Sequence, residues 1–426
     1  MIETILIVMV VLLMLGFPMK IPLIGATLVS FFFFLDMPPE VVVQQMIGGV
    51  KPSTLIAVPM FIFAADIVTK GHAADRLLDM VMRFVGHIKG GLAITTATAC
   101  TLFGAVSGST QATVVAIGGP LRPKLLKAGY NDAFNMAIII NASNIALLIP
   151  PSIGMIVYGV VSGTSIAELF IAGIGPGILT LLLFAGYSYI YAIRKNIPTT
   201  AKASWAERMT ALRGAFWPLG FPIIIVGGIY GGMFSPTEAA SICVLYAIIL
   251  EVLIFKAVKW KELPDIALST GMITAVVFIL VGAGAAFSWA ISFAQIPQAV
   301  IGSLGLYEAS REGVLLAISV AFFIGCMFVD PIVAILILTP IFAPIVASAK
   351  IDPVLVGAIV TLQVALGSGT PPFGCNIFTA VAIFKRPYLE VIRGTGPFIF
   401  MMVLVAIALI YFPQTALWLR DAAFGV

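Results

Sequence analysis

The sequence predicts an all-α polytopic membrane protein built from an inverted repeat, with two re-entrant hairpins and about ten spanning helices. Three observations support this fold class. Hydrophobic residues make up 61% of the 426 residues and charged residues 10%, which is more apolar surface than a soluble domain of this length can bury. Apolar segments of about 20 residues, the length that crosses a bilayer, recur along the chain. The Gly and Pro pattern of the first half also recurs in the second half.

The repeat consists of Gly and Pro residues that interrupt apolar segments. Seven positions recur at a spacing of 221 residues, whereas the Gly and Pro content predicts about one such match. The pairs are Gly104 and Gly325, Pro123 and Pro344, Pro150 and Pro371, Pro151 and Pro372, Gly173 and Gly394, Gly175 and Gly396, and Pro176 and Pro397. In membrane proteins such repeats are commonly inverted. We therefore assign a first repeat to residues 1–195, a basic cytoplasmic linker to 196–214 and a second repeat to 215–426.

The spanning helices are predicted from the apolar segments in chain order. They lie at 2–20, 22–35, 54–70, 131–162, 165–193, 216–233, 237–255, 266–290, 353–384 and 395–419. The segments 131–162 and 353–384 contain Pro-Pro pairs, so both are predicted to be broken within the membrane.

Two other apolar segments, 90–127 and 312–349, are predicted to be re-entrant hairpins. They are interrupted near their middles by Gly108 and by Asp330 with Pro331. Their lengths are suitable for pairs of half-depth helices.

The segment 72–88 is predicted to be a helix that lies along the membrane interface. Leu77 and Val81 belong to an apolar stripe at helical spacing, while Asp75 and Arg83 fall on the other side. We expect a rigid brace beside the first hairpin; a simple amphipathic connector is the alternative.

Charge predicts the orientation, because Lys and Arg collect in short cytoplasmic loops. With the N-terminus and the C-terminus on the periplasmic side, 19 of the 23 Lys and Arg lie inside. The four outside are Lys51, Arg311, Lys350 and Arg420. Five crossings precede the basic linker, so the second half is inverted. The net charge of +4 therefore reflects membrane topology, and no nucleic-acid partner is expected.

The candidate sites lie at four breaks in the helices, two per half. Broken helices within a membrane are tolerated where their free carbonyl groups face protein, water or ions. We predict two or more Na⁺ sites and an anionic substrate between them. The predicted Na⁺ ligands are Ser107, Gly108, Ser109 and Asn141 with the carbonyls around Pro150, and Asp330 with the carbonyls of Gly367, Gly369 and Thr370. The predicted substrate contacts are Ser109, Thr110, Ser152 and Asn376.

Other interpretations of these residues remain open. Ser and Thr commonly bond to the backbone of their own helix in membrane spans. Asp330 is expected to bind a cation or carry a proton, although a solvated structural role is also compatible with a hairpin tip. Asp66 and Glu251 lie nearer span ends and are expected to be interfacial.

The sequence argues against an intramembrane enzyme. A Ser107 nucleophile needs a nearby base, yet the two histidines, His72 and His87, lie on the interfacial segment. The four cysteines are scattered through apolar segments without metal-ligand spacing and are expected to be core residues. A passive channel is the nearer alternative, since duplicated broken helices also build ion filters.

Several long motifs resemble the large membrane subunit of tripartite ATP-independent periplasmic (TRAP) transporters. They are GHAADRLLDMVMRFVGHIKGGLA (71–93), FGAVSGSTQATVVAIGGPLRPKLLKAGY (103–130), LIPPSIGMIVYG (148–159), GGIYGGMFSPTEAAS (227–241) and GSGTPPFGCNIF (367–378). The resemblance covers essentially the whole chain and looks strongest to the sialic acid branch.

The resemblance implies a Na⁺-driven elevator-type importer of organic acids, sialic acid or C4-dicarboxylates among them, in a bacterial inner membrane. It also implies two partners, a periplasmic substrate-binding protein and a small membrane subunit of about four helices. Because no such segment precedes the first span, we expect the small subunit to be a separate chain. The resemblance implies that the hairpins and broken spans move, against a scaffold that includes the first, second, sixth and seventh spans. The family's tip serines, Pro-Pro-Ser motif and second-hairpin acid match Ser107, Ser109, Pro150, Pro151, Ser152 and Asp330.

Overall fold

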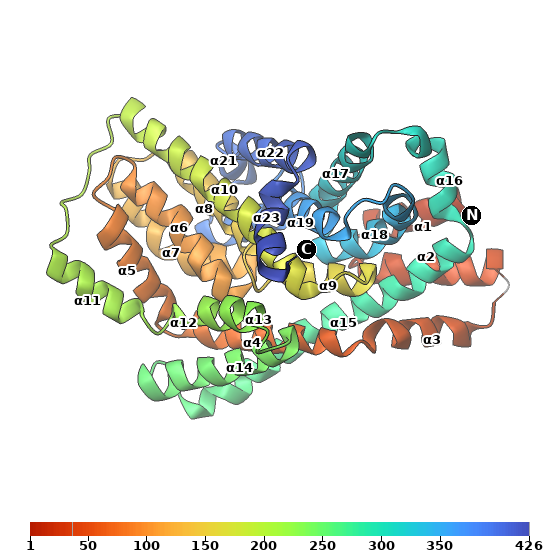
Figure 1. The fold of residues 1–426 in the computed structure, drawn as a ribbon, viewed down its shortest axis with the longest axis horizontal. Helices are drawn as coiled ribbons and strands as arrows, with labels where there is room; N and C mark the ends of the chain where they lie inside the picture. The colour runs from red at the N-terminus through yellow and green to blue at the C-terminus, as the bar shows by residue number, and fades with distance from the viewer. Residues whose placement is uncertain (36, 426) are drawn as a thin grey trace.

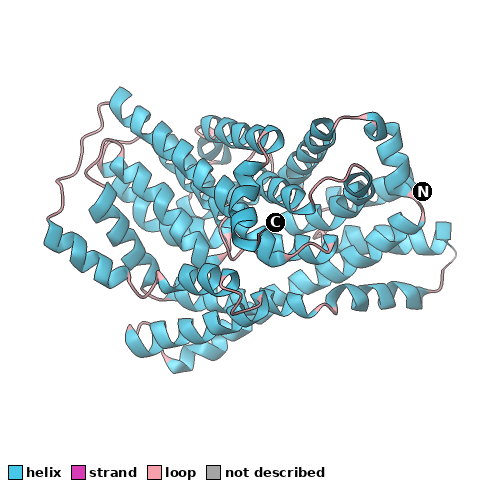
Figure 2. Cartoon of the chain, in the orientation of Figure 1, coloured by secondary structure: helices cyan, strands magenta, loops and turns pink. Residues whose placement is uncertain are grey.

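The computed structural model describes residues 1–35 and 37–425, and this part of the chain is helical with no β-strand (Figure 2). Asp36 and Val426, which fall within the two predicted repeats, lie outside the described residues. Six of the described helices are long and apolar enough to cross a membrane, or eight if each of two bent helix pairs is one span. The polytopic helical fold predicted from composition is thus confirmed.

The first half contains ten α-helices. They are α1 (Ile2–Met14), α2 (Lys20–Ser30), α3 (Pro39–Val50), α4 (Ala57–Lys70), α5 (Ala73–Val85), α6 (Gly91–Ser107), α7 (Thr110–Lys127), α8 (Asp132–Asn144), α9 (Ile153–Ser162) and α10 (Ile166–Arg194). α11 (Trp205–Ala215) lies in the predicted linker and begins with a capping box between Ser204 and Glu207.

The second half begins with short turns, α12 (Gly220–Pro222) and α13 (Gly228–Tyr230), separated by a π-helical segment. The longer elements that follow are α14 (Pro236–Ile248), α15 (Leu263–Phe293), α16 (Ile296–Ser303), α17 (Arg311–Phe328), α18 (Pro331–Ser348), α19 (Pro353–Ser368), α20 (Cys375–Phe384), α21 (Tyr388–Ile392), α22 (Gly396–Tyr411) and α23 (Gln414–Phe424).

Both predicted hairpins form pairs of packed helices, α6 with α7 and α17 with α18. Each of these helices has 17 or 18 residues, which is about 27 Å at 1.5 Å per residue. The hydrocarbon core is about 30 Å thick, and the depth that the hairpins reach in it stays a prediction. Such helices fit a re-entrant hairpin only if they are strongly tilted.

The linker helix α11 is set off from the predicted span 216–233 by a bend of 53° between Ala215 and Gly220. Two other elements differ from the prediction. The span 395–419 bends by 57° before Gln414, where Pro413 interrupts it. α3 was missed because Glu40 and Gln44 lower the apolar content of a 12-residue helix.

The two halves interlock around two buried helices, α8 and α19. On α19 every residue from Val354 to Ser368 is buried, and on α8 every residue from Phe134 to Asn144. α9 of the first half packs on α18 of the second hairpin, while α20 of the second half packs on α7 of the first hairpin. Hence each broken span joins its own half to the hairpin of the other half.

A second group of helices, which we call the framework helices, consists of α2, α3, α4, α14 and α15. α15 packs on α2, α3 and α4, and α4 packs on α14. In Figure 1, α3, α4, α14 and α15 run along the lower edge, below the hairpins and broken spans. α15 also contacts the second hairpin, since a Cβ on Gly284 would lie 2.8 Å from Leu336 of α18.

Candidate functional site

The first break brings a hairpin tip against a broken span. α6 ends at Gly108, which has a left-handed φ of +59°, and Ser109 then caps α7 by accepting a hydrogen bond from the Ala112 N–H at 3.3 Å. A Cβ on Gly108 would lie only 2.7 Å from the Pro151 carbonyl oxygen. Gly108 therefore meets the Pro-Pro break, and the predicted residues Ser107 and Ser109 flank it in the chain.

The hydroxyl groups at this tip form hydrogen bonds within the tip. Ser107 Oγ lies 3.3 Å from Thr113 Oγ1, and Thr113 Oγ1 donates to the Ser109 carbonyl at 2.8 Å. Ser152, which is buried, caps α9 by accepting a hydrogen bond from the Met155 N–H at 3.4 Å. The structure thus gives Ser152 a buried capping role.

The second break is organised in the same way. Asp330 caps α18 by accepting a hydrogen bond from the Ile332 N–H at 2.9 Å. The Phe373 N–H donates to the Met327 carbonyl at 3.1 Å, which ties the broken span to the hairpin. A Cβ on Gly367 would lie 2.4 Å from the Cys326 Cβ, so α19 packs closely on the end of α17.

Buried amide side chains join the two halves. Asn376 of α20 accepts a hydrogen bond from Thr110 Oγ1 at 2.9 Å and donates to Asn144 Oδ1 at 2.6 Å. The lack of a side chain at Gly369 leaves room for the amides of Asn141 and Asn144. A Cβ at Gly369 would lie 2.4 Å from Asn144 Nδ2 and 3.1 Å from Asn141 Oδ1. The predicted residues Thr110 and Asn376 are therefore brought together, and Asn141 lies beside Gly369 of the second break.

Two polar atoms in this cluster lack a hydrogen-bond partner. Asn141 Oδ1 and Asn144 Nδ2 are buried and unpaired among the described residues. A buried carbonyl-type oxygen without a partner is costly unless an ion or water occupies the adjacent space. Asn144 was missed by the sequence analysis, although its position three residues after Asn141 places both on one helix face.

A cavity of about 500 Å³ lies between the hairpin tips and the framework helices. Ser107 and Ser109 line it from the first tip, and Asp330 lines it from the second with an exposed side chain. Of the predicted substrate contacts only Ser109 reaches this cavity; Thr110, Ser152 and Asn376 are buried. The apolar wall opposite comes mainly from α15.

Two acidic residues expected near span ends have hydrogen-bond partners in the structure. Asp66 of α4 lines the same cavity and accepts a hydrogen bond from Thr270 Oγ1 at 2.7 Å. Glu251 is fully buried, and its carboxylate accepts hydrogen bonds from the His72 and Ala73 N–H groups at 3.0 and 3.1 Å. It remains inside because it caps the first turn of α5, where unpaired N–H groups favour a negative charge.

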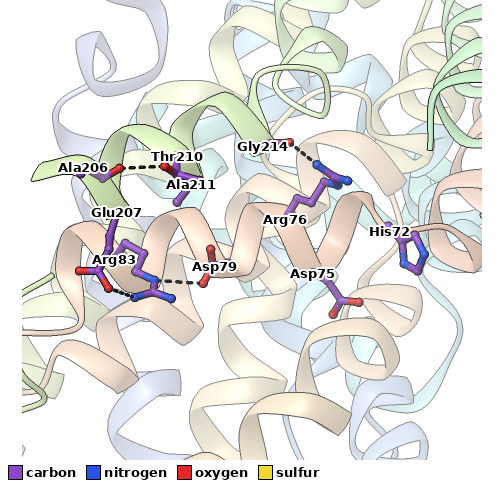
Figure 3. Close-up of a pocket in the computed structure, with 10 residues that line it drawn as sticks. All are labelled: His72, Asp75, Arg76, Asp79, Arg83, Ala206, Glu207, Thr210, Ala211 and Gly214. Carbon is purple, nitrogen blue, oxygen red and sulfur yellow. Dashed lines mark hydrogen bonds and ion pairs between the residues drawn. The ribbon is translucent and has the colours of Figure 1, made fainter. Parts of the chain in front are cut away.

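The predicted interfacial helix is part of a brace that packs on the first hairpin. α5 packs on α6 and on α11, with a groove of about 580 Å³ between α5 and α11. Figure 3 shows that Arg83 reaches Asp79 and Glu207 and that Arg76 donates to the Gly214 carbonyl. Backbone and side-chain hydrogen bonds from Ser204, together with Arg83, lower the pKa of Glu207. The groove is thus a charged helix contact that connects the linker to the first hairpin.

Comparison with known proteins identifies the family. The family model described as the DctM component of the tripartite ATP-independent periplasmic transporter matches residues 6–415. The chain belongs to the DctM family. It is therefore a large TRAP permease and a multi-pass membrane protein, which confirms the predicted family and the prediction that the chain is not an enzyme.

Two relatives of this TRAP permease are similar over nearly their full length. It is 66% identical to the ectoine/5-hydroxyectoine TRAP transporter large permease UehC of Ruegeria pomeroyi, over 99% of each chain. It is 65% identical to the ectoine TRAP transporter large permease TeaC of Halomonas elongata, over 98% of each chain. The C4-dicarboxylate permease DctM of Pseudomonas aeruginosa is 36% identical over 86% of each chain. The resemblance to the sialic acid branch was therefore wrong, because the much higher identity is to ectoine permeases.

A solved structure supports the fold. The Alcanivorax borkumensis YdaH transporter matches with a TM-score of 0.64 and 17% identity, over 90% of this chain and 88% of that chain. At this identity the likeness concerns the fold alone.

Proposed function

We propose that this TRAP permease imports ectoine and 5-hydroxyectoine across a bacterial inner membrane, driven by a Na⁺ gradient. The substrate assignment rests on sequence identities of 66% and 65%, along essentially the whole chain, to two permeases named for ectoine. Ectoine carries a carboxylate and a protonated cyclic amidine, so it is an organic acid that is zwitterionic at neutral pH.

The proposal of Na⁺ coupling is supported by buried oxygen atoms at the breaks, which are potential Na⁺ ligands. Interrupted helices free backbone carbonyls, which are suitable ligands for a hard cation within a membrane. Asn141 Oδ1 is buried and unpaired next to Gly369, and the hydroxyls of Ser107 and Ser109 lie at the first tip. We assign Na⁺ coordination to these groups, to Asp330 and to the carbonyls around Pro150 and Gly367 to Thr370.

An elevator movement is the mechanism that we propose for the import cycle. The hairpins and broken spans interlock through α9 on α18 and α20 on α7, so they are expected to move as one body. The framework helices α2, α3, α4, α14 and α15 are proposed to stay fixed, and the cavity lies at the border between the two groups. Compared with the scaffold expected from the resemblance, this assignment keeps the second and seventh spans as α2 and α14, adds α3, α4 and α15, and leaves out the first and sixth spans.

The family implies two partners for this chain. We propose a periplasmic binding protein that delivers the substrate and a small membrane subunit, encoded as a separate chain, beside the framework helices. Both termini are proposed to face the periplasm, as the distribution of Lys and Arg indicates.

A C4-dicarboxylate is the second candidate substrate. It is favoured by the 36% identity to a permease named for these acids. The lower identity makes it the weaker proposal, and uptake measurements with both compounds separate the two.

Proteoliposomes that contain the permease, the small subunit and the binding protein test the proposed function. We expect labelled ectoine to accumulate when a Na⁺ gradient is imposed, and uptake to stop when K⁺ replaces Na⁺ or when the binding protein is omitted. Undiminished accumulation in K⁺ would disprove Na⁺ coupling. Passive entry without the binding protein would indicate a channel, and uptake of succinate but not ectoine would indicate a dicarboxylate permease.

A further inference from the structure

The cavity between the hairpin tips and the framework helices has two chemically different walls. Ser107, Ser109 and Asp330 line it from the hairpin side, whereas Asp66 lines it from α4 next to apolar residues of α15. Its volume of about 500 Å³ falls in the range of roughly 300–1,000 Å³ that small-molecule sites occupy. A bound molecule would therefore contact hydroxyl groups on one side and a carboxylate on the other.

Asp66 is held in a fixed orientation with bonding capacity to spare. Its Oδ2 accepts a hydrogen bond from Thr270 Oγ1 at 2.7 Å, across the packed pair α4 and α15. The ion pairs found among residues 1–35 and 37–425 do not include Asp66, even though Lys70 lies one turn further along α4. Each carboxylate oxygen can accept about two hydrogen bonds. Oδ1 and part of the capacity of Oδ2 therefore remain for a ligand.

An acid at this position is costly without a partner. Carboxylates within spanning segments are rare and usually pair with a cation or line a ligand route. Thr270 supplies one neutral hydrogen bond, which orients Asp66, and Lys70 acts on the carboxylate by charge without an ion-pair contact between the described side chains. Room for a direct cationic partner therefore remains on the cavity side of Asp66.

We propose that Asp66 binds the cationic amidinium group of the transported zwitterion, an assignment that rests on the proposed specificity for ectoine. An amidinium N–H donates a charge-assisted hydrogen bond to the Asp66 carboxylate, and such bonds are shorter and stronger than neutral ones. The carboxylate of the substrate then faces Ser109 and the first turn of α7, where a helix N-terminus favours an anion.

Asp330 is less suited to this role although it lines the same cavity. It caps α18 and belongs to the hairpin tip to which we assign Na⁺ coordination. Asp66 instead sits on a framework helix, so in an elevator it contacts the substrate only when the hairpins lie beside α4. It also disfavours a dicarboxylate, because a second carboxylate would face a like charge.

The test compares Asp66→Asn with the unaltered permease in complex with its small subunit. Two quantities are measured: uptake of labelled ectoine into proteoliposomes with the binding protein, and the rise in unfolding temperature caused by ectoine or by Na⁺ without the binding protein. A ligand that binds only the folded state raises that temperature. We expect the variant to lose about tenfold in uptake, the effect of one charge-assisted hydrogen bond, and to lose the ectoine-induced rise but keep the Na⁺-induced rise.

Two further variants make the outcome decisive. Asp75→Asn removes a carboxylate from the exposed face of α5, away from the cavity, and should leave both quantities unchanged. Asp66→Glu keeps the charge and should retain more ectoine uptake than Asp66→Asn, which separates binding from a folding defect.

Other results would overturn the inference. Equal ectoine uptake and equal ectoine stabilisation in Asp66→Asn would show that Asp66 does not touch the substrate. Loss of the Na⁺-induced rise would assign Asp66 to ion coordination instead. If the unaltered complex takes up no ectoine while it takes up succinate, the proposed function itself fails, and this inference fails with it.

Discussion

The Gly108→Ala substitution probes the contact between the first hairpin tip and the first broken span. Gly108 has a φ of +59°, and a Cβ there would lie 2.7 Å from the Pro151 carbonyl oxygen. The left-handed conformation costs a residue with a Cβ about 1 kcal/mol, and overpacking against backbone adds about 1–3 kcal/mol. The sum is about 2–4 kcal/mol, since neither the hairpin nor the Pro-Pro segment can move without disturbing the other.

The assay is thermal unfolding of the purified complex together with ectoine uptake. For a protein of this size we expect a fall in Tm on the order of 5 °C, and a clear loss of uptake because the Pro151 carbonyl is displaced from the proposed Na⁺ site. Gly119→Ala is the matched control, since Gly119 lies on the same hairpin in α7 and a Cβ at that position would have no neighbour within 4 Å. Ala in that helix should be neutral or slightly stabilising. A Gly108→Ala protein with the stability and uptake of the unaltered permease would refute the reasoning.

Two more predictions concern transport and stability. Asp330→Ala and Ser109→Ala should each reduce Na⁺-driven uptake sharply while the proteins remain folded, as judged by their elution as single species; near-normal uptake in both would show that the ion sites are misplaced. Arg420→Ala should destabilise the protein by roughly 1–3 kcal/mol. The Arg420 side chain is 8% exposed and joins α23 to the Asp352 carboxylate at 2.6 Å. Its removal leaves that partly buried carboxylate without this ion pair. Arg386→Ala, whose side chain is 46% exposed, should cost less than about 1 kcal/mol in the same unfolding assay.

The sequence predicted the positions of the hairpins and the breaks because Gly and Pro act locally on the backbone. Gly108 permits a left-handed turn between α6 and α7, and the pairs Pro150-Pro151 and Pro371-Pro372 lie in breaks between helices. Composition was enough for the fold class, because an excess of apolar residues has no other stable location than a bilayer. Motifs along the chain were enough to predict the family.

The arrangement of the site could not be predicted in the same way. Thr110 and Asn376 bond across 266 residues of sequence, and Asn141 meets Gly369 of the other half. Such contacts depend on how whole helices pack, and one residue of rotation would turn each side chain away. The predicted resemblance to the sialic acid branch was also wrong, because motifs shared by a whole family do not distinguish the substrates of its members.

Sequence alone thus determined the fold class, the positions of the two hairpins and of the Pro-Pro breaks, and the family to which the chain belongs, because those properties follow from the nature of each residue and its near neighbours. Only the tertiary structure decided that α9 and α20 cross to the opposite hairpins, that Glu251 caps α5, and that Asp66 faces a cavity. A carboxylate in an apolar run can end in lipid headgroups, on a helix N-terminus or beside a ligand. The choice among these is made by the packing of helices that are distant in sequence.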